Sequence, residues 1–194
     1  MRIDRRAALL ALATLVLATA SPAASGDAAP AAPIRAVEAA LAGRDGAAPS
    51  EAAVRAAVAR SFNLDAMARA VLGGQAFTPK QFGRFREALA DHLVLDMLGQ
   101  RRDGRRGTIM IVRTRAIGTG EWVVDTRVET PGRPHRSVSW RVSAGSGRAL
   151  ITDLLGNGAS LVRSWRNRHL PTLRRVGLDG LIERLEARNR RMRG

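Results

Sequence analysis

The feature that most constrains this 194-residue chain is a change of hydrophobic period near residue 108. Residues 121–129 alternate apolar and polar side chains, and so do residues 137–142, which is the two-residue period of a half-buried strand. Thr108–Ile117 and Ala149–Leu155 are further strand candidates. Because the turns between these four segments are too short for parallel crossovers, the sequence predicts a four-stranded antiparallel meander.

Helical patterns flank this meander on both sides. The predicted helices cover Ile34–Ala42, Ser50–Arg60, Leu64–Leu72 and a segment with an apolar stripe from Phe82 to Met97, and two more begin at Ser160 and Asp179. The best start signal is Thr78 as a cap, with Pro79 at the first helical position and Gln81 three residues after the cap. Such segregation of helices and strands is typical of an α+β fold with helices on one face of the sheet.

The first 24 residues have the pattern of an export signal. Arg2, Arg5 and Arg6 give a positive start, and the apolar run Ala7–Ala20 leads into small residues. That run is shorter than the about 20 residues that span a bilayer, which favours a cleaved signal over an anchor. The adjacent Arg5 and Arg6 leave the general and the twin-arginine export routes open. We expect a signal over 1–24, a flexible lead-in over 25–33 and a single domain over 34–194.

Composition narrows the classes of function. The chain has no cysteine, which removes disulfide frameworks, thiol nucleophiles and thiolate metal sites. Its net charge of +15 comes almost wholly from arginine, because Lys80 is the only lysine. Two basic runs, 101–106 and 188–193, attract polyanions, but neither is interleaved with aromatic side chains. We therefore expect no nucleic-acid partner, and we keep as the alternative function an exported basic protein that binds nucleic acid or other polyanions.

The residue patterns do not predict an enzyme. His92, His135 and His169 lie in different segments without the spacing of a metal site, so we expect neither a metal nor a cofactor. Ser160 lacks the second glycine of a nucleophile elbow and is interpreted as a helix cap. A hydrolase that uses Ser160 or Asp153 stays open, because one sequence cannot place an acid beside a base.

Several motifs, in order along the chain, resemble a known family. They are Phe62–Arg69 followed by Leu72-Gly73, the helix Thr78–Leu93, Asp153, Gly158 to Leu161, Trp165-Arg166 and Gly177–Ile182. Together, behind a signal-like leader, they resemble the MlaC or toluene-tolerance family of periplasmic phospholipid-binding proteins over residues 34–190. Arg148, Ala149 and Asn157 depart from the pattern, and the chain has no tyrosine, which indicates a divergent member.

This resemblance implies a fold, a function and partners. The implied fold is a mixed cone in which helices wrap one face of a curved four-stranded antiparallel sheet around an apolar cavity. The implied function is that of a periplasmic carrier, an auxiliary component of ABC transport. It would move phospholipid between an outer-membrane lipoprotein complex and an inner-membrane ABC transporter with an MCE-type subunit. The residue pattern by itself allows a filled core as well as a cavity.

Apolar stripes on the predicted helices and strands supply the candidate site. The side chains expected to line the cavity are Met67, Val71, Phe82, Phe85, Leu89, Leu93, Trp122, Val124, Val138, Trp140, Leu161 and Trp165. Arg113 and Arg166 are the candidates for contact with the headgroup or a partner. An arginine surplus at the mouth would favour an anionic phosphate.

Overall fold

The computed structural model describes residues 28–43, 47–99, 107–145 and 147–194. The helices are α1 (Ala28–Ala42), α2 (Glu51–Ser61), α3 (Leu64–Leu72), α4 (Pro79–Gly99) and α5 (Leu161–Arg193). The strands are β1 (Thr108–Gly118), β2 (Glu121–Glu129), β3 (Arg136–Gly145), β4 (Arg148–Gly156) and β5 (Ala159–Ser160).

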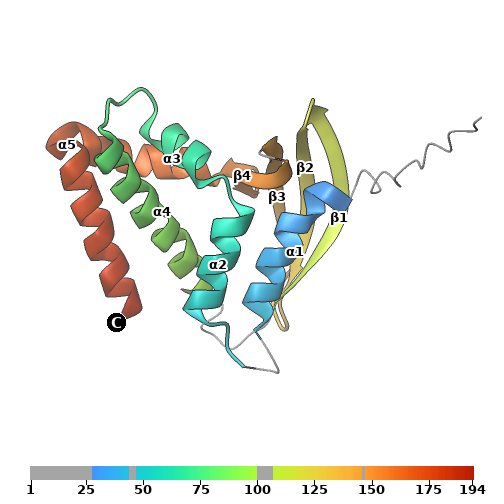
Figure 1. The fold of residues 1–194 in the computed structure, drawn as a ribbon. Coiled ribbons are helices and arrows are strands. Elements are labelled where there is room, and N and C mark those ends of the chain that lie inside the picture. Colours follow the sequence, from blue (N-terminus) through green and yellow to red (C-terminus); the bar gives the residue numbers. More distant parts are fainter. Residues whose placement is uncertain (1–27, 44–46, 100–106, 146) are drawn as a thin grey trace, which may run out of the picture.

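The described elements form two layers, with the helices gathered on one face of the sheet (Figure 1). α1 packs on β1, β2, β3 and β4, whereas α4 packs mainly on α2, α3 and α5. This arrangement confirms the α+β fold class predicted from the segregated periods. α1 therefore lies along the sheet, while α4 lies between α2 and α5 (Figure 1).

Local capping signals fix where the helices begin. The Asn63 side chain accepts a hydrogen bond from the Ala66 amide at 3.0 Å and starts α3. At the start of α4, the Thr78 amide donates to Gln81 Oε1 at 3.0 Å and the Gln81 amide donates to Thr78 Oγ1 at 3.2 Å. This reciprocal pair is a capping box, as the sequence predicts.

The sheet is an antiparallel meander in the order β1-β2-β3-β4-β5. Val124 of β2 lies opposite Trp140 of β3, which in turn lies opposite Leu154 of β4, so one face carries a continuous apolar row. Register shifts interrupt β1 twice and the β3–β4 pairing once. Such bulges increase twist and bend strands, which suits a sheet that curves around helices. The two-residue β5 is an addition to the four predicted strands.

The N-terminal helix is longer than predicted. The expectation of a flexible lead-in over 25–33 is wrong for residues 28–33, because these residues form the first turns of α1. Ala31, Ile34, Val37 and Leu41 are buried at three- and four-residue spacing, so a full apolar stripe lies against the sheet. This burial outweighs the cost of Pro33 inside the helix, a balance that local sequence rules do not reveal.

The C-terminal segment, α5, consists of two helical limbs, which agrees with the two helices predicted to begin at Ser160 and Asp179. Gly177 has φ +70° and ψ −176°, which breaks α5 into two limbs, and the second limb lies beside α4 (Figure 1). Within the described residues, no helix is long and apolar enough to cross a membrane. The expected signal over 1–24 and the basic run 101–106 lie outside the described residues.

Candidate functional site

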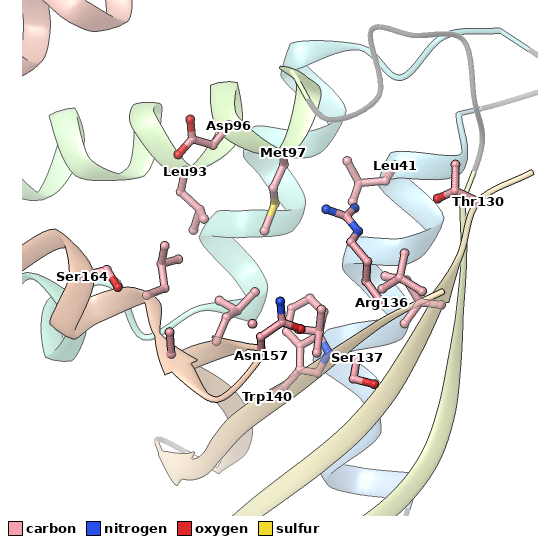
Figure 2. A pocket seen from close by; sticks show the side chains of 18 residues that line it. Leu41, Leu93, Asp96, Met97, Thr130, Arg136, Ser137, Trp140, Asn157 and Ser164 are labelled. Carbon is pink, nitrogen blue, oxygen red and sulfur yellow. The ribbon is translucent and has the colours of Figure 1, made fainter. Parts of the chain in front are cut away.

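A cavity of about 420 Å³ lies between the sheet and the helices (Figure 2). Its volume falls within the roughly 300–1,000 Å³ that is typical of sites for small organic ligands. Another hollow, of about 740 Å³, lies beside α2 and α4, but charged side chains such as Arg55, Arg86 and Asp91 line it. The smaller cavity is therefore the better candidate for an apolar ligand.

The sheet contributes the wall of the cavity through the alternation of its strands. Val138 and Trp140 of β3 face inward, and their partners across the β3–β4 ladder are Gly156 and Leu154, which also line the cavity. Val128 of β2 pairs with Arg136 of β3, and both line the cavity. The inward row of β3 therefore runs from a buried indole through a valine to an arginine.

Helices supply the opposite wall. Leu41 comes from the last turn of α1, Leu93 and Met97 from the last two turns of α4, and Leu161 from the start of α5. The cavity exists because α4 packs mainly on other helices, so that its C-terminal end faces the sheet across a gap.

Polar groups in and under the wall are paired in a way that keeps the wall apolar. Trp140 is buried, and its indole Nε1 donates to Thr126 Oγ1 at 2.9 Å. The Thr126 hydroxyl in turn donates to the Val138 carbonyl oxygen at 2.8 Å. Each donor has an acceptor, so the indole presents carbon to the cavity without an unsatisfied polar group.

Four of the predicted cavity residues line the cavity: Leu93, Val138, Trp140 and Leu161. The structure places the other eight in the core or against it, and these are Met67, Val71, Phe82, Phe85, Leu89, Trp122, Val124 and Trp165. The stripe predicted from Phe82 to Met97 is continuous, but only its C-terminal end reaches the cavity. The rest of that stripe packs within the helical layer.

The two predicted headgroup candidates lie elsewhere. Arg113 of β1 is exposed, and its guanidinium pairs with Asp125 at 3.1 Å. Arg166 of α5 lies against Gly73, where an added Cβ atom would come within 2.6 Å of the Arg166 Nη2 atom. Neither residue lines the cavity. The basic residue that does line the cavity is Arg136, which was not predicted from the sequence. Extending the alternation of Val138 and Trp140 back by two residues would have found it.

Ser160 and Asp153 are engaged at the start of α5. The Ser160 hydroxyl donates to Asp153 Oδ2 and accepts a hydrogen bond from the Arg163 amide at 3.0 Å. Asp153 Oδ1 accepts from the amides of Leu154 and Val162 at 2.9 and 3.1 Å. These contacts cap α5 and hold it to β4, as the interpretation of Ser160 as a cap predicts.

His92 is buried between α4 and α5, the half-buried His169 of α5 lies near it, and neither lines the cavity. His92 Nδ1 lies 3.2 Å from Asn189 Oδ1, and its Nε2 lies 3.5 Å from Asp96 Oδ2. Burial lowers the pKa of His92, and burial together with the nearby His92 lowers the pKa of His169 to about 4. Within the described residues, no three His, Asp or Glu side chains gather in a group that would hold a metal ion.

Fold and cavity together define a class of small α+β proteins that enclose an apolar hollow between a curved meander and its helices. A sequence model of the MlaC protein family matches residues 38–187, which is more than half of the chain. The chain therefore belongs to the MlaC family.

A solved structure has a similar fold. It is a phospholipid-binding protein from Ralstonia solanacearum in complex with a phospholipid, and it aligns with a TM-score of 0.72 at 20% sequence identity. The alignment covers 86% of this chain and 99% of the Ralstonia chain. At this identity the likeness establishes the fold alone. No curated protein matched the sequence.

Proposed function

We propose that this protein is a periplasmic carrier that holds the acyl chains of a phospholipid in the cavity between the sheet and α4. The observation that carries this proposal is an apolar hollow of about 420 Å³ in a member of the MlaC family. The Ralstonia protein of the same fold is described in complex with a phospholipid, which supports the same ligand class here.

Transfer energetics explain why such a carrier is needed. A two-chain lipid has about 30 methylenes, and at about 0.8 kcal/mol each their burial is worth on the order of 20 kcal/mol or more. Free passage through water is therefore very slow. A bilayer and a carrier bury the same chains, so exchange between them is close to neutral and requires no covalent chemistry.

Direction must then come from partners. The carrier would receive or deliver lipid at an outer-membrane lipoprotein complex and at an inner-membrane ABC transporter with an MCE-type subunit. The signal-like residues 1–24 support export to the compartment between those membranes. In this proposal Leu93, Val138, Trp140 and Leu161 contact the acyl chains directly. The predicted residues that lie in the core hold these four in place.

Lipid that travels with the protein tests the proposal. The mature protein, purified from cells without detergent, is expected to carry phospholipid that native mass spectrometry detects and that organic extraction identifies. Protein that is folded but carries no lipid, and that takes up none from vesicles, would contradict the proposal. Salt-dependent binding to duplex DNA that persists in the presence of anionic vesicles would favour the polyanion alternative instead.

A further inference from the structure

The inward row of β3 ends in a charge. Val142, Trp140 and Val138 alternate along the strand on the face that looks toward the helices, and Arg136 is the next member of the same row. Of the described residues that line the cavity, Arg136 is the only basic one. The wall therefore changes from a buried indole to an exposed guanidinium within one strand.

Arg136 lies at one end of the cavity, which we call the rim, where several elements begin or end. It is the first residue of β3, and Thr130 directly follows the end of β2. Leu41 and Met97 lie in the last turns of α1 and α4, so several elements end around this rim. Figure 2 shows the Arg136 side chain extending from its strand toward Leu41 and Met97, and Thr130 also lines the cavity. This rim combines a cation and a hydroxyl with an apolar interior.

The acidic member of the wall lies at the other side. Asp96 lines the cavity from α4, but its Oδ2 atom lies 3.5 Å from Nε2 of the buried His92. In Figure 2, Asp96 and Ser164 occupy the side opposite Thr130 and Arg136. The carboxylate therefore faces the α4–α5 contact, and the two charges of the wall are separated.

We infer that Arg136 binds the phosphate of the bound lipid at the cavity mouth and so sets the orientation of the ligand. The acyl chains then run inward past Val138 and Trp140 toward Leu161. A guanidinium offers two parallel donors to phosphate oxygens, and Thr130, which also lines the cavity, carries a hydroxyl donor. This inference rests on the proposed function and adds the chemical group that the rim recognises.

A competition between two lipids with identical acyl chains tests the inference. Lipid-free protein is incubated with vesicles that contain equal amounts of phosphatidylglycerol and diacylglycerol, and the bound lipid is extracted and counted by mass spectrometry. The wild type is expected to prefer the phospholipid by about tenfold, the effect of one charge-assisted contact at a solvated rim. Arg136→Gln is expected to remove that preference while diacylglycerol uptake is unchanged.

Arg133 provides the matched control, because it lies in the turn just before β3 and lines a neighbouring groove but not the cavity. Arg133→Gln is expected to keep the preference. An Arg136→Gln protein that keeps it, or an Arg133→Gln protein that loses it equally, would overturn the inference. Displacement of the lipid by glycerol 3-phosphate alone would also overturn it, since the site would then bind free phosphate.

Failure of the proposed function gives a different result. If the wild type takes up neither lipid, the proposed function fails and the inference fails with it. If the wild type takes up both lipids equally, only the role of Arg136 fails. Arg136→Lys is a second variant. It keeps the positive charge but lacks the two parallel N–H donors of the guanidinium, so its preference for the phospholipid is expected to lie between those of the wild type and Arg136→Gln.

Discussion

Thr126 illustrates how one buried hydroxyl keeps an apolar wall in place. It accepts from the Trp140 indole and donates to the Val138 carbonyl, so two residues of the cavity wall depend on it. Thr126→Val is expected to cost about 1–3 kcal/mol of unfolding free energy, because the indole N–H loses its acceptor. Urea unfolding measures this cost. Thr152→Val is the control, since its hydroxyl makes only a long 3.4 Å contact, and a change below about 0.5 kcal/mol is expected.

Val138 tests the face on which the cavity lies. A guanidinium at this position would enter the apolar hollow, so Val138→Arg is expected to reduce lipid loading by about tenfold or more. Met110→Arg makes a comparable change on β1, the edge strand of the sheet, where Met110 is already 48% exposed. That variant is expected to load normally. Equal loading by both variants, measured on extracted lipid, would place the ligand elsewhere.

The kink in α5 is the clearest case of an element shaped by one backbone angle. Gly177 has a positive φ, and nothing lies within 4 Å of an added Cβ atom, so the constraint is conformational and not steric crowding. Gly177→Ala is expected to destabilise the protein by about 1–3 kcal/mol. Gly83→Ala in α4 also meets open space, but in helical backbone, and is expected to stabilise by about 0.5–1 kcal/mol. Denaturant unfolding of the two variants should therefore show opposite signs.

The contact between α4 and α5 makes stability depend on pH. Burial first, and then the charges of His92, Arg168 and Arg188, lower the pKa of His169 from 6.5 to about 4. The unfolded chain therefore binds more protons between these values, and stability falls as pH drops from 6.5 toward 4. His92 is shifted in the same direction, chiefly by burial and against the attraction of Asp96.

Between about pH 7 and about pH 5, the wild type is expected to lose on the order of 1–2 kcal/mol through His169, after allowance for its partial exposure. His169→Gln is expected to lose less over the same interval. His135→Gln replaces an exposed histidine and should follow the wild type. Parallel pH profiles for the wild type and His169→Gln, measured by urea unfolding, would contradict this assignment.

At the scale of the whole molecule, the cavity results from which helices pack on the sheet and which pack on other helices. α1 covers the sheet directly, and α4 is held by other helices. A network joins Arg55 of α2 to Glu51 and Asp91, and Arg193 at the end of α5 pairs with the same two carboxylates. These ion pairs link α2, α4 and α5, so helix–helix contacts hold α4 where it does not touch the sheet. We expect the same fold whether the hollow is empty or filled.

Removing the ligand is therefore expected to lower stability without unfolding the protein. Ligand at about 100 times its Kd adds about 2.7 kcal/mol to the folded state. For a domain of this size, that corresponds to a thermal midpoint higher by about 5–10 °C. Calorimetry of lipid-loaded and lipid-free protein measures the difference. Val138→Arg should show almost no such shift, and a large shift in that variant would contradict the placement of the ligand.

The order of the elements, the capping box at Thr78 and the antiparallel meander were predictable because periodicity and caps act over a few neighbouring residues. Family membership was also visible in short ordered motifs. Which apolar side chains border the hollow was not predictable. Phe85 and Leu93 belong to one stripe of α4 and both are buried in the core, yet only Leu93 also lines the cavity.

That difference, the helical turns at residues 28–33 and the position of Arg136 at the rim arise from tertiary packing. A hydrophobic period specifies which face of an element is buried, but not what lies opposite that face. The same leucine fills a core or borders a cavity according to how closely a distant element approaches. In this protein, the separation between the end of α4 and the inward row of β3 determines that Leu93 borders a cavity.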